Sequence, residues 1–150
     1  MKRISIFLSS IALSAAALLG TSCSFNTDDS GDLGQFWHLM SVDTIATGGS
    51  CDVAQRGIYW MAEGAIFQVG IYDGNQNSKY IFQYTNSDGR LLLSDPRLND
   101  RRQNDPSITD VTVLQPYGIN ALEESFAIES VSGGKMVLAS DVLRLHFRAQ

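Results

Sequence analysis

The chain has 150 residues, of which 11 are basic and 16 acidic, so its formal net charge at pH 7 is −5. This length is sufficient for one domain with a single hydrophobic core. The acidic balance disfavours a nucleic-acid partner, because phosphate backbones are bound by clustered cations. The one local basic cluster, Arg97 with Arg101 and Arg102, is interleaved with acidic residues that cancel most of its field. It predicts a solvated loop.

The N-terminus has the organisation of a secretory signal. Lys2 and Arg3 precede an apolar run of 16 residues at 4–19, which small residues and Cys23 follow. This run is short for a membrane-spanning helix, which needs about 20 apolar residues. A cysteine at the cleavage site is typical of lipoprotein signals, because its thiol accepts a diacylglycerol before the leader is cut. We therefore expect a signal peptide over residues 1–22 and lipidation of Cys23; a plain cleaved signal with an incidental cysteine is the alternative.

The residues around Cys23 resemble the looser lipoprotein signals of Bacteroidetes, since Gly20 stands where the common signal has Leu. Residues 23–32 are polar and acidic, which predicts a flexible spacer. Asp28 and Asp29 resemble the surface-export signal of these lipoproteins, with a solubilising linker as the alternative. The resemblance implies a cell-envelope protein that its lipid anchors to the outer membrane, exposed at the surface if the acidic stretch is an export signal.

Residues 33–150 have a dominant hydrophobic period of two. Apolar residues alternate with polar ones over 143–148, and aromatic residues are spaced in the same way over 80–85. This alternation is typical of half-buried strands, and the segments are rich in residues that favour a pleated sheet. The expected strands lie, in chain order, at residues 35–43, 57–62, 65–72, 80–85, 91–94, 108–114, 126–130, 135–139 and 143–148.

Glycine-rich turns separate the strands at 63–64, 73–75, 86–89 and 132–134. Short connections of this kind indicate an antiparallel meander, hence a sandwich or an up-and-down barrel. Closure of about eight strands removes both unpaired sheet edges. We therefore predict an all-β, antiparallel barrel over residues 33–150, whose interior is either filled with side chains or holds one small ligand.

Two regions depart from the strand pattern. Residues 95–107 contain two prolines and several charges, which predicts a long loop with a helical turn at 98–103. Residues 114–124 contain Pro116 and Gly118, which favours a strand end followed by a bend, with one helical turn at 120–124.

The two ends of residues 33–150 resemble lipocalin-like domains. Gly34 precedes Trp37 as a glycine precedes a tryptophan at the entry of such barrels, although two residues separate the pair here and one does in the strict lipocalin pattern. Residues 136–148 resemble the closing hairpin of lipocalin-like domains in small Bacteroidetes lipoproteins of unassigned function. The resemblance implies a barrel in which an arginine of the last strand, Arg144 or Arg148, packs over Trp37. Such a cation–π contact contributes about 0.5–2 kcal/mol. The resemblance implies a fold rather than a function.

Residues that would indicate catalysis or metal binding do not form a recognisable pattern. His38 and His146 lie on the first and last expected strands without further metal ligands nearby, so we expect exposed strand residues there. Cys51 follows a turn, and if Cys23 is lipidated it has no disulfide partner; we expect a small apolar filler near a loop. We predict neither enzymatic activity nor a cofactor.

Aromatic residues crowd the first half of the barrel sequence, where they either pack the core or line a barrel mouth. We expect non-enzymatic binding of a small, partly apolar ligand in the barrel. The alternative is a compact interaction module with a filled barrel that presents its outer surface to an envelope complex or an extracellular protein. The expected ligand-binding residues are Trp37, Tyr59, Met61, Phe67, Tyr80, Phe82 and Tyr84, with Arg144 closing the base.

Overall fold

A computed structural model describes residues 31–72 and 77–150. The predicted signal peptide, the lipidation site at Cys23 and most of the predicted spacer lie outside the described residues. Among the residues described, no helix has the length and hydropathy that a membrane crossing requires.

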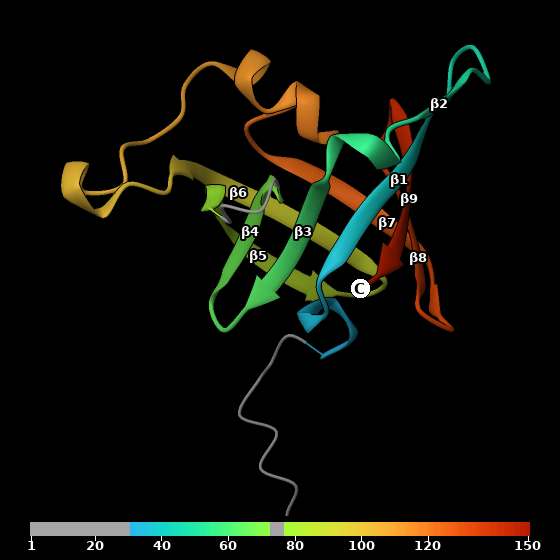
Figure 1. Cartoon of the computed structure of the whole chain (residues 1–150), viewed down its shortest axis with the longest axis horizontal. Helices are drawn as coiled ribbons and strands as arrows, with labels where there is room; N and C mark the ends of the chain where they lie inside the picture. The colour runs from blue at the N-terminus through green and yellow to red at the C-terminus, as the bar shows by residue number, and fades with distance from the viewer. Residues whose placement is uncertain (1–30, 73–76) are drawn as a thin grey trace, which may run out of the picture.

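The described residues form a closed barrel of eight antiparallel strands. Figure 1 shows how these strands curve around one interior. Each strand pairs with the next along the chain, and β9 returns to pair with β1. The prediction of a closed antiparallel meander of about eight strands is therefore confirmed. A short additional strand, β2 (Ser50–Asp52), pairs with the end of β1. The barrel strands are β1 (Trp37–Thr44), β3 (Ile58–Glu63), β4 (Ile66–Ile71), β5 (Asn77–Ser87), β6 (Arg90–Leu98), β7 (Glu124–Ser132), β8 (Lys135–Ala139) and β9 (Leu143–Ala149).

Side chains alternate between the two faces of each strand, and the apolar set points into the barrel and fills it. Trp60 lies at its centre, where its ring contacts those of Phe67, Phe126 and Phe147 at centroid distances of 5.1–5.7 Å. The interior side chains are at most 3% exposed, so almost none of their surface is accessible to a water molecule. These residues are Trp37, Leu39, Ile58, Trp60, Ala62, Phe67, Val69, Phe82, Leu91, Leu93, Phe126, Met136, Leu138, Leu145 and Phe147.

Short 3₁₀ helices cover both ends of the barrel (Figure 1). At one end, η1 (Gly31–Gly34) buries Leu33, and the indole N–H of Trp37 donates to the carbonyl of Asp32 at 3.2 Å. At the other end, η4 (Val111–Val113) and η5 (Gln115–Tyr117) precede the buried Ile119. The indole N–H of Trp60 donates to the carbonyl of Tyr117 at 3.1 Å, which ties this cover to the centre of the core.

The prediction of a strand at 108–114 is wrong. The segment forms η4, because the Asp110 side chain accepts hydrogen bonds from the backbone N–H and the hydroxyl of Thr112 at 2.9 and 2.7 Å. Such a side-chain cap satisfies the first free N–H of a helical turn and competes with strand pairing.

The loop predicted at 95–107 begins too early. Strand β6 continues to Leu98 across Pro96, with Asp95 at φ +48° and a shift in the β5–β6 register. The helical turn expected within 98–103 is present as η3 (Arg101–Gln103), capped by the Asp100 side chain. An irregularity in the strand thus accommodates the proline without ending the pairing.

Residues 120–124 do not form the expected helical turn. The turn lies earlier, in η5, and Glu124 already begins β7. The Glu124 carboxylate accepts a hydrogen bond from the backbone N–H of Asn120 at 2.6 Å, which holds the intervening residues in a bend. Strand β2 was not among the expected strands; it follows directly on the turn that the sequence indicated before Cys51.

Candidate functional site

Five of the predicted ligand-binding residues point into the barrel: Trp37, Phe67, Tyr80, Phe82 and Tyr84. The first four are at most 6% exposed. Tyr84 is partly buried, its ring meets Phe67 edge-on, and its hydroxyl donates to the carbonyl of Gly64 at 3.0 Å. The structure places all five in or against the packed core, and their role in ligand binding stays a prediction.

The expected contact between an arginine of the last strand and Trp37 is not formed. Arg144 lies opposite Asp43, at the far end of β1 from Trp37, and its guanidinium binds both carboxylate oxygens of Glu129 at 2.7 and 2.9 Å. Arg148 lies opposite His38, the neighbour of Trp37, but it is exposed on the outer face while Trp37 is buried inside. The strand alternation therefore separates both arginines from the tryptophan ring.

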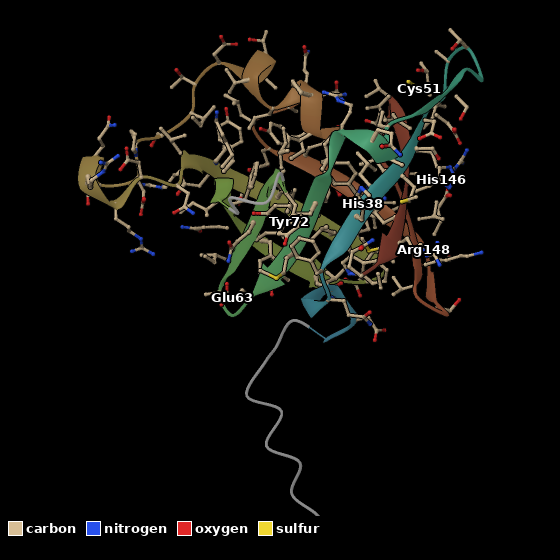
Figure 2. All side chains as sticks on the ribbon, viewed as in Figure 1. His38, Cys51, Glu63, Tyr72, His146 and Arg148 are labelled. Atoms are coloured by element: carbon tan, nitrogen blue, oxygen red, sulfur yellow. The ribbon has the colours of Figure 1, made fainter. Side chains whose placement is uncertain are left out.

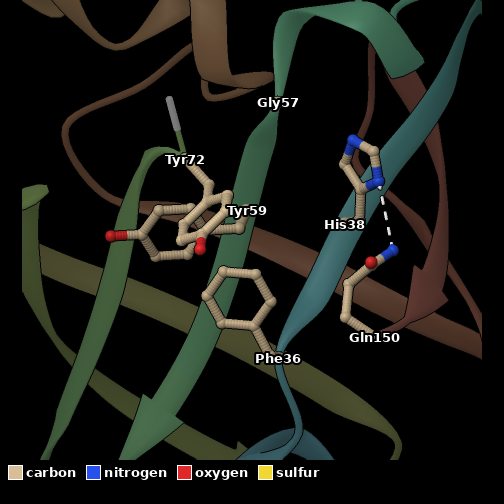
Figure 3. A pocket seen from close by; sticks show the side chains of 6 residues that line it. All are labelled: Phe36, His38, Gly57, Tyr59, Tyr72 and Gln150. Atoms are coloured by element: carbon tan, nitrogen blue, oxygen red, sulfur yellow. Dashed lines mark hydrogen bonds between the residues drawn. The ribbon is translucent and has the colours of Figure 1, made fainter. Parts of the chain in front are cut away.

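Tyr59 and Met61 alternate with the inward-facing Trp60 and lie on the outside of the wall. Tyr59 is nevertheless only 1% exposed. The Phe36 ring stacks on it at 4.5 Å between centroids, and Tyr72 meets Phe36 edge-on at 6.1 Å and 82°. Figure 3 shows these rings together on one side of a pocket on the outer surface.

Two glycines make room for this outer aromatic cluster. Gly70 lies opposite Tyr59 in the β3–β4 pairing, so no side chain competes with the tyrosine ring there. Gly57 has φ +63°, and a Cβ at this position would lie 2.6 Å from the carbonyl oxygen of Tyr72. The backbone N–H of Tyr72 donates to the carbonyl of Gly57 at 2.8 Å. The close approach of the Gly57 and Tyr72 backbones fixes the position from which the Tyr72 side chain projects.

His38 and Gln150 form the opposite side of the pocket (Figure 3). The His38 Nε2 atom lies 2.9 Å from the carbonyl oxygen of Ala54. Because a carbonyl only accepts, Nε2 carries the proton, and Nδ1 is left to accept from the Gln150 amide at 3.3 Å. The backbone N–H of Gln150 donates to the carbonyl of Phe36 at 3.1 Å. Backbone contacts therefore hold both polar side chains.

The pocket, which we call the outer aromatic pocket, is lined by Phe36, His38, Gly57, Tyr59, Tyr72 and Gln150 and has a volume of about 520 Å³. It opens to solvent beside Tyr72, which is 56% exposed. Its volume falls within the range of about 300–1,000 Å³ typical of small-molecule sites. An aromatic wall facing a polar wall suits a ligand with one apolar face and one polar edge.

The two histidines lie apart on the outer wall, as Figure 2 shows. His146 lies opposite Ser41 and its Nε2 is 2.7 Å from the Asp43 carboxylate, whereas His38 lines the outer aromatic pocket. Hydrogen bonds from Ser50 and from His146 lower the pKa of the Asp43 carboxyl. Across residues 31–72 and 77–150, no group of three histidine, cysteine or carboxylate side chains is placed to hold a metal ion.

Cys51 differs from the sequence-based expectation, and Glu124 is a buried carboxyl. Cys51 is exposed on β2, so it is not the apolar filler that was expected. Glu124 is only 9% exposed, and burial raises its pKa although Asn120, Ala121 and Ser140 donate hydrogen bonds to its carboxylate. These three donors give Glu124 a structural role at the start of β7.

Of the six residues that line the outer aromatic pocket, only Tyr59 was among the predicted ligand-binding residues; the other five are Phe36, His38, Gly57, Tyr72 and Gln150. The alternation of the first strand carried a usable signal, because Phe36 and His38 have the opposite parity to the inward-facing Trp37. Gln150 had no such signal, since its position beside Phe36 depends on the register between the first and last strands.

Sequential antiparallel strands that close around one core define a barrel of the lipocalin-like class. The sequence pattern of the lipocalin-like domain family matches residues 17–149, and the chain belongs to this family. The predicted resemblance is confirmed.

Two crystal structures are similar in fold. A lipocalin-like protein from Bacteroides uniformis is 17% identical, with a TM-score of 0.58 over 80% of this chain and 100% of that one. A protein from Bacteroides eggerthii, described as uncharacterized, is 15% identical, with a TM-score of 0.58 over 79% of this chain and 99% of that one. No curated protein matches the sequence.

Proposed function

We propose that this protein is a non-enzymatic, lipid-anchored lipoprotein of the cell envelope that binds a small, partly apolar ligand in the outer aromatic pocket. The lipocalin-like barrel is consistent with small-ligand binding. Support for the anchor is the leader sequence that ends at Cys23. The same leader supports a location at the outer membrane.

One observation carries the binding proposal: the stacked Phe36 and Tyr59 rings, with Tyr72 at their edge, face His38 and Gln150 across a pocket of about 520 Å³. The interior offers less support for a ligand site, because its side chains leave almost no accessible surface. Stable proteins seldom leave aromatic surface exposed in a concave, pre-formed site without a binding role.

Native mass spectrometry of the full protein purified from its host envelope tests the binding proposal. We expect a bound small molecule that is lost in Tyr72→Ala and retained in Val142→Ala. Val142 is a matched control because it is 48% exposed, close to the 56% of Tyr72, and lies outside the outer aromatic pocket. Bare wild-type protein, or equal occupancy in both variants, would contradict the proposal.

Membrane fractionation tests the anchor separately. We expect Cys23→Ser to release the protein from the membrane fraction, because the diacylglycerol acceptor is removed. Cys51→Ser is the control, since this thiol is free and exposed on β2. Retention of the Cys23→Ser variant would rule out the lipid anchor.

A second candidate function, an interaction module of an envelope complex, is favoured by the packed interior. Ile45 and Val142 are 44% and 48% exposed and adjacent, since the backbone N–H of Ile45 donates to the carbonyl of Val142 at 3.0 Å. Cross-linking in intact envelopes distinguishes the two functions. An adduct with another protein that Ile45→Asp abolishes and Tyr72→Ala preserves would favour the interaction module.

A further inference from the structure

We infer that the ligand of the outer aromatic pocket is a carbohydrate, bound through one uncharged sugar ring, an inference that rests on the proposed function of the same pocket. The reasons are the absence of lysine, arginine and carboxylate side chains among the described lining residues, the angle between the accessible rings and the hydrogen-bonding capacity left on Gln150.

The lining, as far as the described residues form it, favours a ligand that does not depend on charge. None of the six described lining residues has a carboxylate, lysine or arginine side chain, and the two ring nitrogens of His38 are engaged by the carbonyl of Ala54 and the side chain of Gln150. Arg148 lies opposite His38 but is exposed and does not line the pocket. A charged group that entered would lose hydration without gaining an opposite charge from these six side chains.

The accessible aromatic rings are nearly perpendicular to each other rather than parallel. One face of Phe36 is occupied by Tyr59, which is itself buried, so the accessible rings are Phe36 and Tyr72 at 82° to each other. A flat aromatic ligand is best held between two parallel faces. A saturated ring is thicker and presents a face of C–H groups, which packs against one aromatic face while its rim meets the second ring.

The polar wall suits hydroxyl groups. The Gln150 amide uses one N–H on His38 Nδ1, which leaves a second N–H and the carbonyl oxygen side by side. A hydroxyl both donates and accepts, so neighbouring hydroxyls of a sugar can use this donor and this acceptor together. A wholly apolar ligand would leave both groups unsatisfied, and such loss is costly where they are shielded from water.

The open side of the pocket agrees with a polar ligand. Tyr72 is 56% exposed, so a bound molecule would keep part of its surface in water. Sugar hydroxyls on that side would remain hydrated. An apolar ligand, by comparison, gains most where a pocket encloses it.

Saturation-transfer NMR on the full protein, purified from envelopes in detergent, tests the inference. The probes are glucose, galactose, mannose, xylose, N-acetylglucosamine and the disaccharide cellobiose. We expect at least one to receive saturation, strongest on its ring C–H protons, with an affinity that does not change with salt. Tyr72→Ala should weaken its binding by about 10-fold or more, and Val142→Ala should not. Absence of saturation for every sugar, or unchanged affinity in Tyr72→Ala, would overturn the carbohydrate assignment.

A neutral planar dye, N-phenyl-1-naphthylamine, separates this outcome from failure of the proposed function. If the dye binds and Tyr72→Ala abolishes its binding while no sugar binds, the carbohydrate inference is wrong and the pocket still binds small ligands. If neither dye nor sugar binds, both are overturned. Circular dichroism melting of each variant confirms that it remains folded.

Discussion

Trp60 and Tyr59 are neighbours on β3, equally buried, and yet they belong to two different aromatic clusters. Trp60 is the centre of the barrel core, packed among Phe67, Phe126 and Phe147. Tyr59 lies on the outside, under Phe36. The difference teaches that aromatic content alone does not identify a binding site in a barrel of this kind. The parity of the residue along its strand decides whether a ring stabilises the fold or remains available to a ligand.

The two clusters also differ in how completely their members are covered. Every ring of the inner cluster is at most 3% exposed, whereas in the outer cluster exposure rises to 56% at Tyr72. Substitution in the inner cluster should therefore change stability most, and substitution at the edge of the outer cluster should change binding most.

The largest expected effect is at the centre of the inner cluster. Trp60→Ala removes a fully buried indole and its hydrogen bond to Tyr117, so we expect a loss of about 3–5 kcal/mol in the free energy of unfolding. Denaturant unfolding measures it. Trp60→Phe, which keeps a ring, should cost clearly less; an equal cost for both variants would mean that packing around the ring is not what stabilises the core.

Gly57 links the fold to the outer cluster and comes next. Gly57→Ala must place a Cβ 2.6 Å from the carbonyl oxygen of Tyr72, at φ +63°. We expect about 1–3 kcal/mol of destabilisation and weaker ligand binding, because the Tyr72 backbone has to move. Gly64→Ala is the control, since its φ is +57° but its Cβ would meet no atom within 4 Å. Equal effects of the two variants would show that backbone conformation alone, and not the contact with Tyr72, matters.

A smaller effect is expected at Glu124, a buried carboxyl outside both clusters. Burial raises its pKa, so the folded protein keeps a proton that the unfolded chain has already lost between the ordinary and the raised pKa. The free energy of unfolding therefore falls as the pH rises through that interval, and Glu124→Gln should abolish this part of the dependence. Urea unfolding across the interval measures it, with the exposed neighbour in Glu123→Gln as control. Parallel pH profiles for wild type and Glu124→Gln would contradict the assignment.

The smallest effect on stability is expected at the edge of the outer cluster. Tyr72→Ala removes a ring that is 56% exposed, so the free energy of unfolding should change by no more than about 0.5 kcal/mol. Ligand occupancy should be lost in the same variant. A large loss of stability would mean that the outer cluster supports the fold as the inner one does, and the contrast between them would disappear.

The barrel was predictable because its strands repeat a two-residue alternation and are joined by glycine-rich turns. The hairpin of β8 and β9 illustrates this, with residues 135–139 expected and Lys135–Ala139 observed. The pattern failed where side chains bind the local backbone. Asp110 converts an apparent strand into η4, and Glu124 holds a bend where a helical turn was expected.

The outer aromatic pocket was only partly predictable. Tyr59 was expected to contact a ligand, but it was grouped with core residues such as Phe67 because composition does not distinguish the two faces of a strand. His38 and Gln150 are 112 positions apart in sequence and meet only through the closure of β9 on β1. Such a pair depends on register, which a single sequence does not specify.

Strand β1 pairs unequally with its two neighbours, and this links the outer aromatic pocket to the stability of the barrel wall. β1 is joined to β9 through seven residue pairs but to β3 through two, Trp37 with Trp60 and His38 with Tyr59. Of the junctions that close the barrel in the described residues, the β1–β3 junction has the fewest residue pairs, so we expect local opening of the wall to begin there. A ligand that contacts Phe36 on one side of this junction and Tyr72 on the other would stabilise the pairing of β1 with β3. Amide hydrogen exchange in these two strands would then slow on binding, so exchange rates would report whether the pocket is occupied.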